Sequence, residues 1–213
     1  MIYAIVGAGG KTSLLKEMAA RFRREGKSVF VTTTTRMFIE EDTLLTDDAD
    51  LILNTLRKDG YVFAGVPEEA KIKSLPADVY SRICEAADVV LVEADGSKHM
   101  PLKYPNENEP VIPDNADEIL VVCGLHGLGK AAKDVCHRLE LVKQHLDISD
   151  DTQITADHVY RLVMEGYVNP LKEKYPQKKI TVVPRHYGSP AQSAVAAMLQ
   201  QAANCDGAKK EPE

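Results

Sequence analysis

The chain has 213 residues, of which 44% are hydrophobic and 27% are charged, and its formal net charge at pH 7 is −6. This length and balance predict a single α/β domain over residues 1–205 and a disordered tail over residues 206–213. The negative charge disfavours a general nucleic-acid binder, because no basic excess is available to neutralise phosphates. The sequence lacks both a signal peptide and the ~20 apolar residues of a membrane span, so we expect a cytoplasmic protein with no membrane partner.

Residues 2–13 are typical of a buried strand, a glycine turn and the start of a helix. Tyr3–Val6 form a short apolar run, and glycines follow at positions 7, 9 and 10. Glycine permits positive φ and lets a ligand approach the backbone. Apolar residues at helical spacing then predict a helix from about Thr12 to Glu25, with Gly26 as its stop. The unpaired N–H groups and partial positive charge of a helix N-terminus favour phosphate.

The glycine motif is a shortened relative of the phosphate-binding loop G-x-x-x-x-G-K-[ST]. We predict that it binds ATP or GTP, with Lys11 on the terminal phosphate and Thr12 as a ligand of Mg²⁺. The predicted nucleotide-binding residues are Gly7, Ala8, Gly9, Gly10, Lys11, Thr12 and Ser13. Two alternatives stay open, a purely structural glycine turn and a dinucleotide site. A dinucleotide site would require an acidic residue about 20 positions on, where Lys27 stands.

A threonine run and an arginine follow the second predicted strand, Ser28–Thr33. In open α/β sheets, ligands bind outside the carboxyl ends of the strands. We therefore predict that Thr33 and Thr34 line the reacting phosphate and that Arg36 pairs with a phosphoryl group as a catalytic residue. The alternative is that the threonines only form strand surface.

Residues 37–87 could be an insertion beside the nucleotide site. Their pattern predicts a helix over residues 47–58 that ends at Gly60, a strand over Tyr61–Val66, and a helix from Pro76 to about Ala87.

Two carboxylates close the next predicted strand, Asp88–Glu93. Its apolar core fits a strand buried on both faces, and an acid at its tip has the form of a Walker-B element near Mg²⁺. We predict that Glu93 and Asp95 are catalytic residues that complete the metal site begun by Thr12, one on the metal and one orienting the nucleophile. The alternative is a polar cap on the strand followed by a turn.

A proline-rich segment, residues 97–113, is expected to form a long ordered loop at the same edge of the sheet. Lys98 and Lys103 lie within it. We predict that they bind the nucleotide or an anionic substrate, although each alone could be a solvated side chain.

The remaining pattern predicts strands over Glu118–Cys123 and Lys179–Pro184, with helices over Lys133–His145, Thr155–Glu165 and residues 189–203. Gly166 is the expected stop of the middle helix. Glycines at positions 124, 127 and 129 suggest a second close backbone approach or a flexible turn. The expected fold is α/β, with a mostly parallel sheet flanked by helices on both faces, like that of P-loop NTPases.

The glycine motif, the run Thr32–Arg36 and the stretches 92–103 and 109–113 together resemble the YqeC-type family, accessory proteins of selenium-dependent molybdenum hydroxylases. The resemblance implies a P-loop-like α/β domain and a role in maturing such a hydroxylase or its selenium cofactor. One departure is the end of the last strand, Pro184-Arg185-His186-Tyr187, where members of the family often carry an acidic base-reading motif. Guanine specificity therefore does not carry over, and His186 or Tyr187 could stack on a base instead.

Our leading hypothesis is a Mg²⁺-dependent ATP- or GTP-binding accessory protein for a molybdenum hydroxylase or its cofactor, with NTPase or phosphoryl-transfer activity left open. A second hypothesis is a chaperone that binds a molybdopterin-type cofactor or the hydroxylase without hydrolysis. A third is an oxidoreductase that uses NAD(P).

Overall fold

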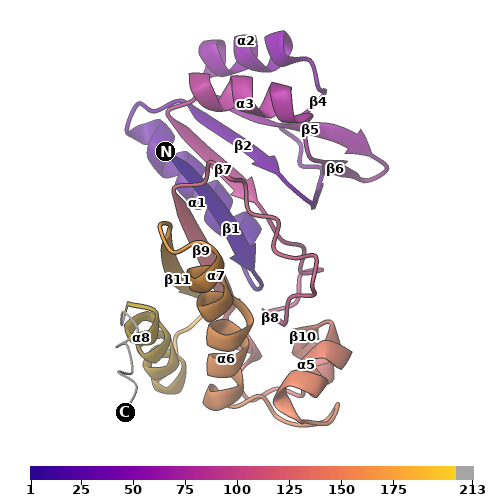
Figure 1. Ribbon diagram of the computed structural model, residues 1–213, viewed down its shortest axis with the longest axis vertical. Helices are drawn as coiled ribbons and strands as arrows, with labels where there is room; N and C mark the ends of the chain where they lie inside the picture. Colours follow the sequence, from indigo (N-terminus) through magenta and orange to yellow (C-terminus); the bar gives the residue numbers. More distant parts are fainter. Residues whose placement is uncertain (205–213) are drawn as a thin grey trace.

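The computed structural model describes residues 1–204, so the predicted tail at 206–213 lies outside the described residues. A nine-stranded sheet runs through the molecule in the order β11-β9-β1-β7-β2-β5-β6-β3, with β4 paired to β5 (Figure 1). Its strands are β1 (Ile2–Gly7), β2 (Val29–Thr33), β3 (Arg36–Phe38), β4 (Thr43–Leu45), β5 (Tyr61–Glu68), β6 (Lys71–Lys73), β7 (Val89–Glu93), β9 (Glu118–Gly124) and β11 (Lys179–Arg185). Among the strands of this sheet that the structure describes, the pairings of β6 with β5 and β3 are antiparallel and the others are parallel.

Helices cover both faces of this sheet. The helices are α1 (Lys11–Arg24), α2 (Ala49–Asp59), α3 (Ala77–Ala86), α4 (Ala132–Val135), α5 (Leu139–Leu146), α6 (Ala156–Val163), α7 (Asn169–Lys174) and α8 (Pro190–Asn204). One face packs Ile5, Leu91 and Val122 against α1. The other face is covered at one end by α2 and α3 and at the other by α6 to α8 (Figure 1). The predicted α/β class with a mostly parallel, doubly covered sheet is confirmed.

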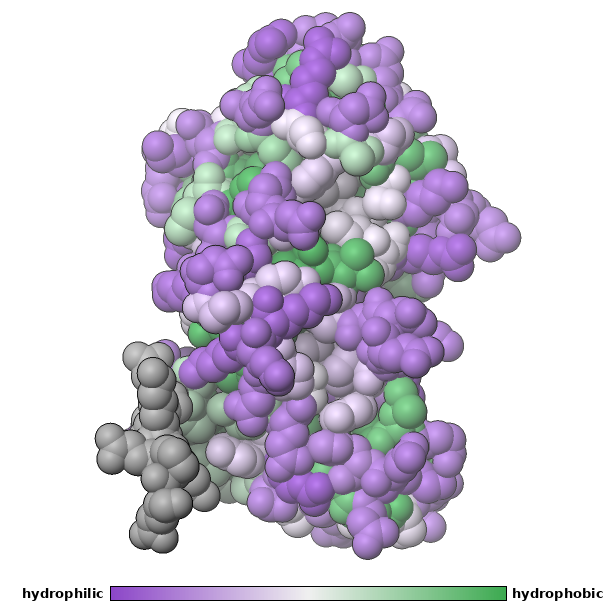
Figure 2. Space-filling view, viewed as in Figure 1, coloured by the Kyte–Doolittle hydropathy of each residue, from purple (hydrophilic) through white to green (hydrophobic). Residues whose placement is uncertain are grey.

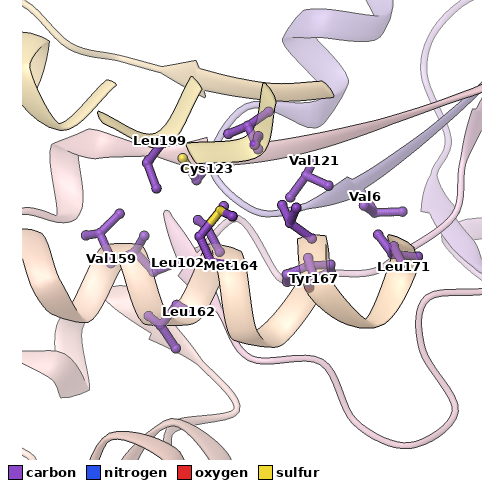
Figure 3. Packing of buried hydrophobic residues seen from close by; sticks show 14 of the residues in the cluster. Val6, Leu102, Val121, Cys123, Val159, Leu162, Met164, Tyr167, Leu171 and Leu199 are labelled. Carbon is purple, nitrogen blue, oxygen red and sulfur yellow. The ribbon is translucent and has the colours of Figure 1, made fainter. Parts of the chain in front are cut away.

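The alternation of side chains along the strands explains the two layers. Ala4 and Val6 of β1 point to the face opposite Ile5, where they join Val121 of β9 and Tyr167 in one buried cluster. Figure 3 shows the side chains of the α6–α7 helical run meeting those of β1 and β9 in this cluster. Each strand of the centre is therefore apolar on both sides, as parallel sheets require.

Residues 36–87 contribute β3, β4, β5 and β6 to the same sheet. Asp48 caps α2 by accepting from the N–H groups of Asp50 and Leu51, and Gly60 ends the helix with φ 65°. The antiparallel strands β6 and β3 extend the sheet beyond β5.

Two predicted helices were wrong in their extent. The segment 133–145 contains α4, the short strand β10 (Cys136–His137) and α5, because Arg138 takes a left-handed φ of 60° and breaks the helix. Strand β10 pairs with β8 (Leu102–Lys103) inside the proline-rich segment. Gly166 is not a helix stop, because α6 continues through a π-helical turn, η2 (Met164–Val168), into α7. Gly166 instead lies where a Cβ atom would be 3.2 Å from the ring of Tyr104.

No helix within residues 1–204 is long and apolar enough to cross a membrane.

Candidate functional site

The turn between β1 and α1 presents a row of unused backbone donors. Gly7, Gly9 and Gly10 all have positive φ, so the loop takes a path that other residues would resist. Helix α1 has no side-chain cap, and its first internal bond joins the Leu14 N–H to the Gly10 carbonyl at 2.9 Å. The backbone N–H groups of residues 9–13 donate to no acceptor within residues 1–204. These donors, with the helix dipole, form an anion site.

The first two predicted loop donors are already engaged. The Gly7 N–H donates to Asp95 Oδ2 at 3.1 Å, and the Ala8 N–H donates to the Val122 carbonyl at 2.9 Å. Since a phosphate cannot use these groups without breaking a buried bond, we correct the predicted donor set: it begins at Gly9 instead of Gly7.

Close packing against neighbouring strand ends explains two loop glycines. A Cβ on Gly9 would lie 2.5 Å from the Cα of Gly124, at the end of β9. A Cβ on Gly10 would lie 3.1 Å from Nε2 of His186. The glycines at 9 and 124 therefore pack on each other, so the backbone that closely approaches Gly124 is that of the glycine loop.

Lys11 is buried at the first position of α1 and its side chain folds back over the loop. It is 4% exposed, and its Nζ donates to the Gly7 carbonyl at 2.7 Å and to Ser97 Oγ at 3.0 Å. Burial lowers the pKa of Lys11, while the charges of Glu93 and Asp95 oppose that shift. The ammonium thus stands beside the unused loop donors with spare capacity for an anion.

A cavity of about 760 Å³ opens in front of this loop. It is lined by Gly9, Gly10, Lys11, Thr12 and Ser13 of the loop, and by side chains from β3, β6, the end of β7, the turn 96–99, and residues 126, 137, 138 and 186. The cavity therefore lies at the carboxyl ends of β1, β7 and β2, where ligands of open α/β sheets are expected.

Glu93 is the buried acid that faces the cavity. It is 7% exposed, it lines the cavity, and within the described residues its carboxylate has no hydrogen-bond partner. Burial raises the pKa of Glu93, and the nearby charge of Lys11 opposes this shift. A buried carboxylate without a protein partner beside an anion site suits a cation that arrives with the anion.

Asp95 does not belong to this cavity, so its predicted role as a metal ligand and catalytic residue is corrected. It is 0% exposed, and both carboxylate oxygens are occupied. Oδ1 pairs with Lys103, and Oδ2 accepts from the Gly7 N–H at 3.1 Å and from the Tyr167 hydroxyl at 2.6 Å. Asp95 therefore fastens the loop strand to the helical layer below it.

Lys103 is likewise corrected, from ligand binding to structure. Its side chain is fully buried and donates to the Gly96 carbonyl and to Glu109 Oε2, each at 2.5 Å, as well as to Asp95. Glu109 Oε2 also pairs with Arg138 at 2.9 Å. This network holds the proline-rich segment against the loop, with Glu109 and Arg138 at the wall of the cavity.

The threonine run supplies one cavity residue, which is not among those predicted. The hydroxyls of Thr33 and Thr34 donate to the carbonyls of Glu93, at 2.7 Å, and Val111, at 2.6 Å. Neither residue lines the cavity, whereas Thr35 does, so the roles predicted for Thr33 and Thr34 are corrected.

Arg36 and Lys98 both line the cavity, so the anion-binding roles predicted for them remain open. Arg36 Nε pairs with a Glu68 carboxylate oxygen at 2.5 Å, and the Arg36 side chain is 67% exposed.

Among the cavity residues, His126, His137 and Arg138 were not singled out for this site from the sequence, whereas His186 was a candidate for stacking on a base. His126 and His186 pack edge to face with centroids 5.0 Å apart, beside Gly10. Burial, and then the cations Lys103 and Arg138, lower the pKa of His137 to about 4. Tyr187 is 48% exposed and does not line the cavity. The signal for the histidines was their position after β9 and β11, at the same sheet edge as the loop.

Comparison with known proteins agrees with the sequence motifs. The profile of the family described as YqeC protein matches residues 3–140. The YqeC protein of Escherichia coli (strain K12) is 33% identical over 170 residues, covering 76% of this chain and 64% of that relative, so the chain spans just under two thirds of its length. The solved hydrogenase maturation factor HypB from Archaeoglobus fulgidus is 17% identical, with a TM-score of 0.37 over 96% of this chain and 90% of that one, a likeness too weak to support a conclusion. The family profile covers more than half of the 213 residues of this chain, and the chain therefore belongs to the YqeC family.

Proposed function

We propose that the protein binds a nucleoside triphosphate, ATP or GTP, together with Mg²⁺. The observation that carries this proposal is the free row of N–H groups at the start of α1, beside the buried Lys11 ammonium and facing one cavity. The donors would receive the phosphates and Lys11 would balance their charge, so that binding uses a prearranged electrostatic environment.

The magnesium site would be built from Thr12 and Glu93. Both line the cavity, and the unpartnered carboxylate of Glu93 would be neutralised by the cation. Mg²⁺ commonly takes only one or two protein oxygens and fills its octahedron with water and phosphate oxygens. This fits the described residues, among which no three His, Cys, Asp or Glu side chains form a metal-binding group.

Calorimetric titration of Mg-ATP and Mg-GTP tests the site directly. Wild type should bind one of them, and Lys11→Ala should lose at least ~1.4 kcal/mol, tenfold in affinity. Lys27→Ala is the matched control, because it removes an exposed lysine just beyond the far end of the same helix. Failure of wild type to bind either nucleotide would refute the proposal. A melting curve of Lys11→Ala without nucleotide separates lost binding from lost folding.

The biological role we propose is maturation of a selenium-dependent molybdenum hydroxylase or its cofactor, in the cytoplasm. Membership of the YqeC family supports this context. Deleting the gene should lower the activity of such a hydroxylase, and wild type should restore it. If Lys11→Ala restores it equally well, nucleotide binding is not needed for that role, and the chaperone without hydrolysis becomes the better explanation. Restoration that needs Lys11, with turnover of the nucleotide, would favour an enzyme.

A further inference from the structure

An exposed aromatic pair, Phe38 and His99, lies on the flank of the cavity away from His126 and His186. The rings of Phe38 in β3 and His99 stack with centroids 5.2 Å apart and planes 17° apart. Both residues line the cavity, yet Phe38 is 45% exposed. The Lys71 ammonium lies 4.6 Å from the centroid of the Phe38 ring. Because Phe38 and His99 are both exposed despite these contacts, the pair keeps aromatic surface at the mouth of the cavity on which a planar ring can stack.

The backbone that carries His99 is strained. Lys98 and His99 are consecutive residues with φ of 47° and 61°, in a region that residues other than glycine seldom adopt. Such conformations cost free energy and are concentrated at active sites and ligand-binding sites. The turn directs Lys98 and His99 to the same cavity, so its strain is linked to the placement of these two side chains.

Basic side chains surround the aromatic pair. They are Arg36, Lys71, Lys73 and Lys98. Glu68 is shared between Arg36, at 2.5 Å, and Lys73, at 3.9 Å, and Glu40 pairs with Lys16. Within the described residues Lys98 has no ion pair. In a chain of net charge −6, this concentration of cations attracts an anion. Figure 2 shows the protruding part of the molecule around the β5–β6 hairpin as predominantly hydrophilic.

The order of the strands separates this flank from the glycine loop. The loop follows β1, Glu93 ends the neighbouring β7, and the chain leaves β2 to reach Arg36 and Phe38. The histidine pair lies on the other side of β1, after β9 and β11. A nucleotide whose phosphates sit on the loop and whose base lies toward the histidines would leave the aromatic flank free, with Glu93 between the two.

We propose that the Phe38–His99 pair and the basic side chains around it form a second binding site, for an anionic compound with a planar heteroaromatic ring. The ring stacks on the aromatic pair and the anionic group meets Lys98, Arg36 and Lys73. The placement of the neighbouring ligand rests on the proposed nucleotide site, but the second site itself forms without it. Nucleotide-like monophosphates and pterin carboxylates share this chemistry.

Fluorescence titration with 2-aminopurine riboside 5′-monophosphate tests the second site. The chain has no tryptophan, so the emission of the probe is read against little protein background. The titration uses wild type saturated with Mg²⁺ and a non-hydrolysable triphosphate, and Lys11→Ala without it. Binding to Lys11→Ala shows the second site even if the nucleotide proposal fails. Phe38→Ala should lower the affinity for the probe about tenfold, which is the loss expected when one stacked base loses its aromatic partner.

Matched variants separate stacking from folding. Phe38→Tyr keeps a ring and should bind within about threefold of wild type, which corresponds to about 0.6 kcal/mol. Leu45→Ala removes an equally exposed apolar side chain outside the cavity and should change nothing. Unlabelled purine monophosphate or pterin-6-carboxylate should displace the probe, and the stronger competitor identifies the class of ligand that the site prefers. Ribose 5-phosphate, which lacks the ring, should not displace the probe. The inference is overturned if Phe38→Ala binds the probe with the affinity of wild type. It is also overturned if Phe38→Ala lowers the affinity for the triphosphate and not that for the probe.

Discussion

Two buried carboxylates stand one residue apart at the end of β7, and the structure gives them opposite surroundings. Glu93 faces the cavity, and no hydrogen-bond donor within the described residues satisfies its carboxylate. Asp95 is fully enclosed and accepts from Lys103, Tyr167 and the Gly7 N–H. Each has a buried lysine nearby, Lys11 for the first and Lys103 for the second. The difference is therefore in how completely the protein itself satisfies the acid.

This difference separates a binding residue from a structural one. A carboxylate whose oxygens are all occupied by protein donors stabilises the fold and has little capacity for a metal. A buried carboxylate that lacks donors costs free energy unless a ligand or a proton completes it. Variants at the two positions should consequently move stability in different directions.

The largest expected effect is that of Asp95→Asn. The substitution leaves Lys103 buried with Glu109 as its remaining acidic partner, and removing one member of a buried ion pair costs about 3–5 kcal/mol. We expect about 3 kcal/mol of lost unfolding free energy in urea titrations, because Glu109 still compensates part of the charge. Asp59→Asn, at an exposed acid ending α2, should stay within about 0.5 kcal/mol of wild type.

A double variant sharpens this prediction. Adding Lys103→Met to Asp95→Asn removes the uncompensated ammonium, and Glu109 keeps its contact with Arg138. The double variant should lose less stability than the sum of the two single losses, with a coupling of about 1–3 kcal/mol. Simple additivity would show that the pair does not act as a unit, and the contrast with Glu93 would lose its basis.

Tyr167→Phe should have the next largest effect. It removes the hydroxyl that donates to Asp95 Oδ2 at 2.6 Å, and a hydrogen bond to a charged group contributes about 1.5–3 kcal/mol. Burial and the charge of Asp95 raise the pKa of Tyr167, so the phenol stays protonated and the loss should not vary between pH 6 and 9. Urea unfolding measures it. Nucleotide affinity, measured under folding conditions, should remain at the wild-type value; a tenfold loss would place Asp95 in the binding site after all.

The fold could largely be predicted because its signals are local. Runs such as Tyr3–Val6 and the apolar part of β7 are buried on both faces, and Asp48, Gly60 and Thr155 act through neighbouring backbone groups. The break at Arg138 and the continuation through Gly166 could not be predicted in this way. They depend on β10 pairing with β8 and on the ring of Tyr104, contacts that are distant in sequence.

The site divides along the same line. The loop donors and Lys11 follow from a contiguous motif, whose positions relative to the strand and helix are fixed by the chain. Asp95 is a predicted metal ligand because an acid at the tip of a strand has the form of a Walker-B element, and Lys103 is a predicted anion-binding residue because its loop lies at the same sheet edge. Their mutual pairing, closed by Tyr167 from 72 positions away, carries no signal in one sequence. The same holds for Phe38 and His99, which meet only through the fold.

The last prediction, and the one that defines the contrast, concerns Glu93→Gln. Burial raises the pKa of Glu93, so its folded-state pKa lies above the value of about 4.3 of an unfolded chain. Below about pH 4 the Glu93 carboxyl is protonated in both the folded and the unfolded state, and the wild type has its full free energy of unfolding. Part of that free energy is lost as the pH rises through the folded-state pKa. Glutamine does not titrate. In paired urea titrations from pH 4 to pH 8, Glu93→Gln should gain on wild type as pH rises, by about 1.4 kcal/mol for each unit by which the pKa is raised, and then level off. Parallel curves would mean that groups of the protein itself satisfy the Glu93 carboxylate in the apo protein, and that it is not held ready for a cation.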